Sequence, residues 1–543
     1  MGKICVIDIE TDGLEPTVIH CVATYNPGVG HSRVFETPEN LQAYLDNFET
    51  IVAHNGCSYD FPALSKLWNI DVPFDKQVDT LVMSRLSMPD RKDGHSLEAW
   101  GHRLSMPKCD FKGPWDTYTT EMRDYCVQDV MVCAKLYDFL LLEMKDFSEK
   151  SVRDEHRMQI LANKVQDHGF YFNIPLALDL YGRLKAEEVQ IEKDMQSVFP
   201  PTEVQMKTKV KYVPFNPASR KQIGERLQAL GWKPTHYTET GLAKVDESTL
   251  ESCEIPEAKI LARYFMIQKR TAMIDSWVKA AARDNRVRCT YHTLGAVTNR
   301  MSCSSPNLQQ IPSVRKPYGV ECRSMWKAHG MNRLIDTDAQ GLELRVLAHY
   351  IDDASYTKEL LTGDIHTANQ HMAGLDTRDQ AKTFIYALLY GAGDYKIGTI
   401  VNGSAADGAQ LRKRFLSNLP AYNRFQRAVI DKAERQGTLK AIDGRVLRVR
   451  SAHAAVNTLI QGSSAVLMKK WFLYTDYLLE KKGTKAGIVA MVHDEMVIES
   501  PFSTVDLSSD CVKLAISLVN KAYALKCDLG CEVKIGNNWS EIH

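Results

Sequence analysis

The first 147 residues alternate short β-branched segments with segments of helical periodicity, and this alternation limits the fold more than any other feature. Each segment is bounded by turn-forming Gly, Pro or Asn residues, and strands that alternate with helices are typical of an α/β domain. Strands are predicted at residues 3–9, 20–25 and 51–54, and helices at 58–68, 79–86, 96–104 and 119–145.

The size and charge of the chain restrict the remainder. A length of 543 residues predicts about three or four domains of roughly 150 residues each. Basic and acidic residues balance at 67 each, so the chain could bind a polyanion only through a local basic patch. The 13 scattered cysteines, without paired zinc spacing, favour reduced thiols in a cytosol. No run approaches the roughly 18 apolar residues that span a bilayer, so we expect no membrane partner.

Carboxylates gather where the predicted elements of the first domain end. Asp8 and Glu10 lie two residues apart on the first strand, so both project from one face. Asp60 follows a buried strand, and Tyr125 and Asp129 lie four residues apart on one helix face. Hard oxygen ligands suit Mg²⁺ or Mn²⁺, whereas a lone Asp-x-Glu is also typical of a solvated strand end.

Three motifs in this domain, Asp-x-Glu, Asn-x-x-x-Tyr-Asp and Tyr-x-x-x-Asp, resemble those of the DnaQ-like 3′-to-5′ exonucleases of the Tyr subtype. The resemblance implies a ribonuclease H-like domain that hydrolyses phosphodiesters with two metal ions. It makes Asp8, Glu10, Asp60 and Asp129 catalytic metal ligands. Tyr125 would orient the attacking water, whereas by itself it is equally typical of a core aromatic residue.

A second set of carboxylates lies in the C-terminal half. A short strand at residues 334–339 leads into a helix at 341–349 and exposes Asp338 near the strand end. Asp336 lies on the same strand face, so spacing alone leaves both as candidate ligands. His493-Asp494-Glu495 interrupts an apolar run at 487–500, as the turn of a hairpin would.

A cationic and aromatic stripe is predicted on the helix that begins near residue 378. Its four members recur every four residues, which places them along one side of the helix with a slow drift. Such a stripe offers cations to phosphates and a ring to a base, although most charged patterns of this spacing are solvated faces. The members are Arg378, Lys382, Tyr386 and Tyr390.

These motifs are similar to motifs A, B and C of family A (Pol I-like) DNA polymerases. Motif A is Asp-x-x-x-x-Glu-Leu-Arg, motif B is Arg-x-x-x-Lys followed by Tyr-Gly, and motif C is His-Asp-Glu. The likeness extends over nearly the whole chain and is to the replicative polymerases of short-tailed phages. Further agreement lies in Thr298-Asn299-Arg300, 306–312, Gly363-Asp364-Ile365-His366 and 457–462.

The resemblance implies a right-hand polymerase domain with an α+β palm and helical thumb and fingers, after the exonuclease domain. The implied boundaries are exonuclease at 1–147, thumb at 148–290, palm at 291–350 and 457–543, and fingers at 351–456. Motif A spacing selects Asp338 over Asp336, and the implied metal ligands are Asp338 and Asp494. Glu495 would support the primer end or the metal site. The pair Ala339-Gln340 departs from the usual motif A, which leaves nucleotide positioning in doubt.

The remaining roles concern the nucleotide and the DNA. Arg378, Lys382 and His366 would hold the triphosphate. Glu343 would be the steric gate against a ribose 2′-hydroxyl, and Tyr386 would permit dideoxynucleotide incorporation. Tyr390 would stack at the template position, and Arg300, Gln461 and His493 would contact the minor groove.

Two basic stretches are candidates for contact with the DNA backbone. In the first, residues 215–220 predict a helix capped by Asn216 with Pro217 at its first position, and Ser219 and Arg220 would bind phosphate. Nearby Lys207, Lys209, Lys211 and Lys221 favour a salt-sensitive grip over a merely charged surface. The second stretch comprises residues 440–450. It would either line the template side of the fingers or form an exposed hairpin.

The predicted protein is therefore a DNA-directed DNA polymerase with a 3′-5′ proofreading exonuclease and two Mg²⁺ ions per site, replaceable by Mn²⁺. Primer–template DNA and dNTPs are its implied ligands, with a phage helicase–primase and a single-strand binding protein as candidate partners in the cytoplasm of an infected bacterium. A host processivity factor is not predicted. The alternatives are a nuclease whose C-terminal region only grips DNA, and a DNA-binding scaffold without turnover.

Overall fold

The computed structural model describes residues 3–543, and contacts between residues divide them into two units. Unit 1 runs through His168 and adds Cys289–Gln309 and Ile335–Lys534. Unit 2 comprises Gly169–Arg288, Gln310–Leu334 and Ile535–His543. Among the described residues, no helix is long and apolar enough to cross a membrane.

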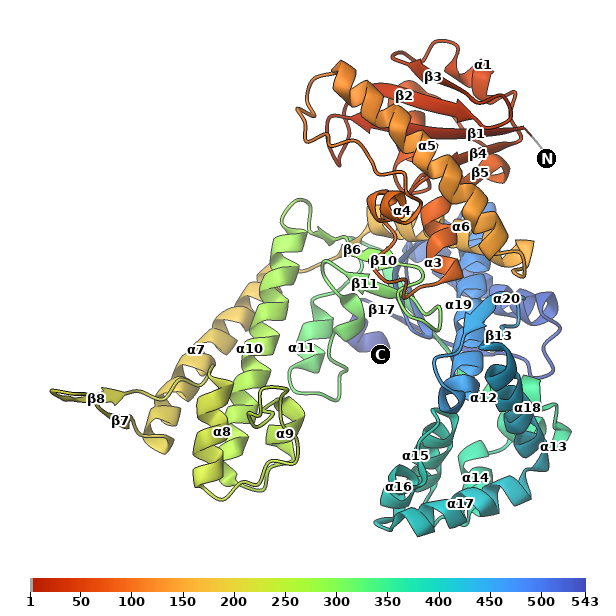
Figure 1. Cartoon of the computed structure of the whole chain (residues 1–543). Coiled ribbons are helices and arrows are strands. Elements are labelled where there is room, and N and C mark those ends of the chain that lie inside the picture. The colour runs from red at the N-terminus through yellow and green to blue at the C-terminus, as the bar shows by residue number, and fades with distance from the viewer. Residues whose placement is uncertain (1–2) are drawn as a thin grey trace. The chain divides into compact units, whose positions relative to one another are not determined.

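A five-stranded sheet of order β3-β2-β1-β4-β5 forms the N-terminal part of unit 1. β1 pairs antiparallel with β2 and parallel with β4, and α5 lies across one face of the sheet (Figure 1). The other face is covered by α1, α2 and η1, so both faces are buried. The elements are β1 (Ile4–Thr11), β2 (Ile19–Asn26), β3 (His31–Phe35), α1 (Leu41–Leu45), β4 (Thr50–Ala53), α2 (Asp60–Ala63), the π-helix η1 (Leu64–Trp68), η2 (Phe74–Lys76), β5 (Gln77–Asp79), α3 (Thr80–Ser87), α4 (Leu97–Arg103) and α5 (Thr120–Glu143).

The α/β character predicted for this part is confirmed, but two of its strands were missed. β3 is an edge strand without a fully buried residue, so it has no apolar run for the pattern to detect. β5 has three residues, too few for any periodicity.

The region from residue 149 to residue 198 is helical but is not one continuous helix. Two helices, α6 (Glu149–His168) and α7 (Ile174–Val198), are separated by the short strand β6 (Phe170–Tyr171). Gly169 has φ +65°, the left-handed conformation that commonly ends a helix. Contacts place α6 in unit 1, whereas the resemblance implied a thumb that begins at residue 148, and the implied domain boundaries stay predictions.

The central sheet has the order β15-β16-β12-β17, and the long helix α19 is buried along most of its length. The strand, helix and hairpin predicted at 334–339, 341–349 and 487–500 are confirmed. The elements are β10 (Thr290–His292), β11 (Ser302–Ser304), η3 (Leu308–Gln310), β12 (Arg333–Ala339), α12 (Leu342–Ile351), η5 (Ala452–Ala454), α19 (Ala455–Lys481), β15 (Gly487–Val492), β16 (Glu495–Ser500), η6 (Phe502–Thr504), α20 (Val505–Ala522) and β17 (Cys531–Gly536).

A helical segment follows α12 in the chain. The N-terminus of α15 carries a capping box, in which Thr377 accepts from the Gln380 backbone and Gln380 reaches back to the cap. The elements are α13 (Ala354–Thr362), α14 (Ile365–Ala373), α15 (Arg378–Leu389), α16 (Asp394–Gly398), η4 (Thr399–Val401), α17 (Ala405–Asn418), α18 (Pro420–Gln436), β13 (Thr438–Lys440) and β14 (Val446–Arg448).

The basic stretch at 440–450 forms the hairpin β13–β14, and its arginines are engaged by the protein. Arg445 is 1% exposed and is paired with Glu155 at 2.5 Å and with Asp443 at 2.8 Å. Arg448 and Arg450 pair with carboxylates of the N-terminal part. Of the two alternatives for this stretch, the hairpin is observed, and the buried charge of Arg445 is paired within unit 1.

Unit 2 is built on α7 and α10, which lie side by side (Figure 1). The Tyr264 hydroxyl of α10 donates to Glu192 of α7 at 2.8 Å. Aromatic rings pack around the buried Trp326 in tilted and edge-to-face arrangements and form part of the core of the unit. The further elements are β7 (Thr202–Gln205), β8 (Val210–Val213), α8 (Arg220–Ala229), α9 (Glu247–Glu251), α10 (Pro256–Ala281), β9 (Arg286–Val287), α11 (Gly319–Ser324) and α21 (Trp539–Ile542).

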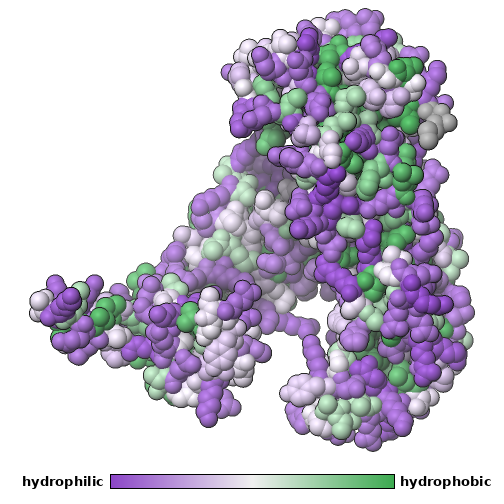
Figure 2. Space-filling model, viewed as in Figure 1, coloured by the Kyte–Doolittle hydropathy of each residue, from purple (hydrophilic) through white to green (hydrophobic). Residues whose placement is uncertain are grey.

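The predicted cap of the helix at 215–220 needs correction. Ser219, not Asn216, caps α8 by accepting from the Gln222 backbone. Asn216 instead accepts from the Ala218 backbone, forming a turn ahead of the helix. The preceding hairpin β7–β8 is exposed on both strands, and its viewed face in Figure 2 carries hydrophilic and hydrophobic residues.

Candidate active sites

A cavity of about 330 Å³ in unit 1 collects most of the predicted motif residues of the C-terminal half. Its walls come from the end of β12, the start of α12, one side of α15, the middle of α19 and the β15–β16 turn. Gln461 and the cations Arg378 and Lys382 are not part of the described lining. The lining includes Arg300, Asp338, Glu343, Tyr386, Tyr390, Lys469, His493 and Asp494.

One backbone hydrogen bond brings the two predicted metal ligands together. The Ala339 amide donates to the Asp494 carbonyl at 2.9 Å, which fastens the end of β12 to the hairpin turn. His493 has φ +50° and, with Asp494, makes the two-residue turn between β15 and β16. Burial and then Asp494 raise the pKa of Asp338 to about 7, so the two carboxylates interact.

Asp336 and Asp338 differ in burial although they share a strand. Asp336 is 5% exposed, and burial followed by Glu495 raises its pKa to about 9. Asp338 is exposed and lines the cavity. A metal ion could therefore reach Asp338 directly, whereas Asp336 and Glu495 form a buried carboxyl pair behind it.

Glu343 is a buried acid in the wall of the cavity. It is 7% exposed in the first turn of α12. Arg300 forms an ion pair with one of its oxygens, and the Tyr390 hydroxyl donates to the other at 2.9 Å. The carboxylate is therefore held in one orientation in the cavity wall, beside the Tyr386 ring.

The cations of α15 lie together with His366. Asp364 caps α14 and pairs with Arg378, whose Nε lies 2.7 Å from its carboxylate. Burial, then Arg378 and Lys382, lower the pKa of His366. Arg378 and Lys382 are both exposed, so the group presents positive charge at the surface beside a neutral imidazole.

Ser219 and Arg220, predicted to bind phosphate, are partly engaged within unit 2. The Arg220 guanidinium lies over the Phe265 ring at 4.7 Å and donates to the Val245 carbonyl. Ser219 uses its hydroxyl as the α8 cap. Contact of either residue with DNA stays a prediction.

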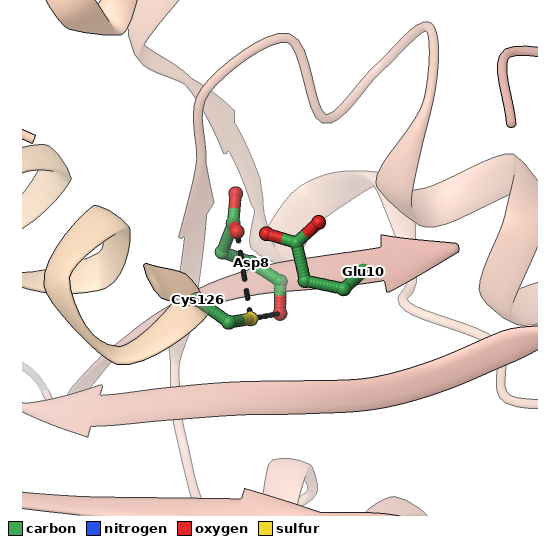
Figure 3. Close-up of side chains that lie close together, drawn as sticks. All are labelled: Asp8, Glu10 and Cys126. Carbon is green, nitrogen blue, oxygen red and sulfur yellow. Dashed lines mark hydrogen bonds between the residues drawn. The ribbon is translucent and has the colours of Figure 1, made fainter. Parts of the chain in front are cut away.

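A second carboxylate site lies on the N-terminal sheet. The side chains of Asp8 and Glu10 project from the same side of β1, as predicted, and Cys126 of α5 lies close to both (Figure 3). One ligand atom from each of these three residues lies within 4.8 Å of the others. The Cys126 thiol donates to the Asp8 carbonyl at 3.4 Å and to its carboxylate at 3.5 Å. Burial raises the pKa of this thiol, which favours a neutral donor to Asp8.

All four predicted carboxylates of this site interact. Burial raises the pKa of Asp8 well above its ordinary value, with Asp129 and Asp60 adding to the effect. Burial likewise raises the pKa of Glu10 and of Asp60 to about 8 and that of Asp129 to about 6. Oδ1 of Asp129 is buried without a hydrogen-bond partner among residues 3–543. Concentrated negative charge with an unsatisfied oxygen fits divalent cations.

The structure also places Lys108 at this site, which sequence reasoning missed. Its ammonium lies 2.5 Å from Oδ2 of Asp129 and 4.4 Å from the centroid of the Tyr125 ring. Lys108 lies in the connection between α4 and α5, where no periodicity or motif marks it. Cys126 was passed over for a different reason, because a buried cysteine inside a helix is ordinary core.

The chain is similar to known DNA polymerases in sequence and in fold. The model of the family described as DNA polymerase family A matches residues 183–541. The DNA-directed DNA polymerases of Enterobacteria phage T3 and Escherichia phage T7 are each 32% identical, covering 99% of this chain and 100% of each relative. The structure titled POL domain of Pol1 from M. smegmatis, in complex with DNA primer-template and dNTP, superposes with a TM-score of 0.81 at 20% identity. That match covers 99% of this chain and 96% of the other, and it shows a shared fold.

Proposed function

The chain belongs to DNA polymerase family A, and we propose that it extends the 3′ end of a DNA primer with dNTPs chosen by a template. The observation that carries this proposal is the pairing of Asp338 with Asp494 in a cavity that also presents Glu343 and Tyr386. A carboxylate near the end of β12 and one in the β15–β16 turn, on backbones joined by a hydrogen bond, make a rigid site for divalent ions.

Asp338 and Asp494 would hold two Mg²⁺ ions, or Mn²⁺ in their place, and these supply the charge that activates the primer hydroxyl and stabilises the leaving pyrophosphate. Arg378, Lys382 and His366 would bind the triphosphate, because they present cations and a donor from neighbouring helices. Glu343, in the wall of the cavity, would fill the space that a ribose 2′-hydroxyl needs and so exclude ribonucleotides. Arg300, His493, Gln461 and Tyr390 would contact primer and template.

We further propose that the N-terminal domain is a ribonuclease H-like 3′-5′ exonuclease that removes mispaired primer ends. Asp8, Glu10, Asp60 and Asp129 would hold two metal ions, which supply a nucleophilic water and stabilise the leaving oxygen. Tyr125 would orient that water. The support is the cluster of four mutually repelling carboxyls, of which Asp8 is half-buried and the others are buried, with Tyr125 on the same face of α5 as Asp129.

The test is a 5′-labelled primer on a longer template with Mg²⁺, incubated with and without dNTPs. We expect extension with dNTPs that Asp338→Ala abolishes, and shortening without dNTPs that Asp8→Ala abolishes. Asp338→Ala should still shorten the primer, and Asp8→Ala should still extend it. The retained activity shows in each case that the variant is folded. Shortening alone would support a nuclease that merely grips DNA, and unchanged primer in both reactions would support a scaffold.

Action in the cytoplasm of an infected bacterium, beside a phage helicase–primase and a single-strand binding protein, belongs to the same proposal. Its support is the similarity to the two phage polymerases over nearly the full chain. Synthesis on single-stranded template coated with the cognate binding protein would test it.

A further inference from the structure

Lys108 bridges two side chains of the N-terminal carboxylate site. Its ammonium contacts Oδ2 of Asp129 at 2.5 Å and lies over the Tyr125 ring. The lysine side chain is 17% exposed, and that of Asp129 is 5% exposed. A charge pair this sheltered is much less screened than a surface ion pair.

The segment that carries Lys108 is fixed by the helices on either side of it. The Met106 amide donates to the Gly101 carbonyl of α4 at 2.9 Å. From α5, Gln128 donates to the Pro107 carbonyl at 3.0 Å and Lys135 donates to the Leu104 carbonyl at 2.7 Å. A Cβ on Gly101 would come within 2.8 Å of the Met106 carbonyl oxygen, so the close approach requires glycine. These contacts therefore fix the backbone on both sides of Lys108 relative to α4 and α5.

The two oxygens of Asp129 have different surroundings. Oδ2 takes the Lys108 contact, whereas Oδ1 is buried and has no hydrogen-bond partner in the described chain. A carboxylate held through one oxygen can offer the other to a metal ion in a fixed direction.

We propose that Lys108 is a positioning residue of the exonuclease site, which fixes Asp129 and Tyr125 so that the free Asp129 oxygen faces the metal ions. The inference rests on the proposed exonuclease function. It deepens that function by adding a cation to a site otherwise made of carboxylates and one phenol. Lys108 acts through Asp129 and Tyr125, not by contact with the DNA.

The experiment compares Lys108→Met, Lys108→Arg and Lys112→Met in the full chain carrying Asp338→Ala, which removes a metal ligand of the polymerase cavity. Lys112 is the matched control, since it lies in the same connection with its side chain 85% exposed. Mn²⁺ binding is followed by electron paramagnetic resonance without DNA. Degradation of a 5′-labelled single strand is then measured at saturating Mn²⁺.

We expect Lys108→Met to lose about 10- to 100-fold in Mn²⁺ affinity, in degradation rate, or in both, as outer-shell substitutions typically do. Lys108→Arg should recover most of the loss, and Lys112→Met should match the parent. Unchanged affinity and rate in Lys108→Met would overturn the proposal. Tighter Mn²⁺ binding at an unchanged rate would do so too, because Lys108 would then be only a competing counter-ion.

Two controls keep the inference separate from the proposed function. Asp8→Ala tests the exonuclease itself: if the parent degrades DNA and Asp8→Ala does not, the site is active whatever Lys108 does. Polymerase extension by Lys108→Met in a chain with intact Asp338 should equal that of the parent. A matching loss of extension, or an equal defect in Lys108→Arg, would indicate misfolding instead of positioning.

Discussion

Tyr390 donates a 2.9 Å hydrogen bond to Oε2 of Glu343, joining the C-terminal end of α15 to the first turn of α12. Arg300 pairs with the other Glu343 oxygen. Both oxygens are thus engaged and the side chain cannot swing out of the cavity wall. A group that excludes a substrate by size must be held rigidly in this way.

Glu343→Ala is expected to raise the ratio of rNTP to dNTP incorporation, because it removes the side chain that would meet a ribose 2′-hydroxyl. Single-nucleotide extension with matched rNTP and dNTP measures this ratio. Tyr390→Phe removes only the hydrogen bond and should give a smaller rise. An unchanged ratio in Glu343→Ala would refute the steric-gate assignment.

Tyr386→Phe should reduce dideoxynucleotide incorporation relative to dNTP use. The resemblance to family A implies that the phenolic hydroxyl substitutes for the missing 3′-hydroxyl contact, and the ring lines the cavity beside Glu343. Chain termination on a primed template, at several ddNTP to dNTP ratios, checks the prediction. Equal termination by both proteins would rule out this role.

Without divalent ions, the chain is expected to lose thermal stability as the pH rises from about 6 to about 8. Folding raises the pKa of Glu10 and Asp60 to about 8, above their unfolded values near 4. The native state therefore holds more protons than the unfolded state in this window, and the corresponding stabilisation is lost as the pH increases.

Added Mg²⁺ should raise the Tm more at the higher pH, since ionised carboxylates bind the ion. The measurement is the Tm in EDTA and in Mg²⁺ at both pH values. Glu10→Gln should flatten the dependence in EDTA by removing one of the titrating groups. A Tm in EDTA that does not fall with pH would contradict the prediction.

Arg445→Met should lower the free energy of unfolding by about 3–5 kcal/mol, because it leaves Glu155 and Asp443 buried without their arginine. Arg448→Met is the control on the same hairpin, where an exposed ion pair contributes about 1 kcal/mol or less. Urea unfolding followed by tryptophan fluorescence compares the two. Equal decreases in the free energy of unfolding for the two variants would show that burial of the ion pair does not determine how much stability is lost.

Local pattern was enough to predict several elements and the carboxylates that they carry. Asp8 and Glu10 share a face because strand side chains alternate, and the 487–500 hairpin was evident from its interrupted apolar run. Local pattern did not mark the end of α6, where the left-handed Gly169 separates this helix from β6 and α7. Nor did it mark the pairing of Arg445, whose charge is neutralised by Glu155, distant in the sequence.

The sequence by itself determined which residues could do chemistry, because residue type and spacing along one strand or helix depend only on local geometry. Tertiary structure alone decided which of them meet. Asp338 is exposed and Asp336 is buried only because of how β12 packs. Packing also places Glu343 between Arg300 and Tyr390 and brings Lys108 into contact with Asp129. Such contacts join residues far apart in the chain, and their geometry follows from packing across elements, which no local periodicity encodes.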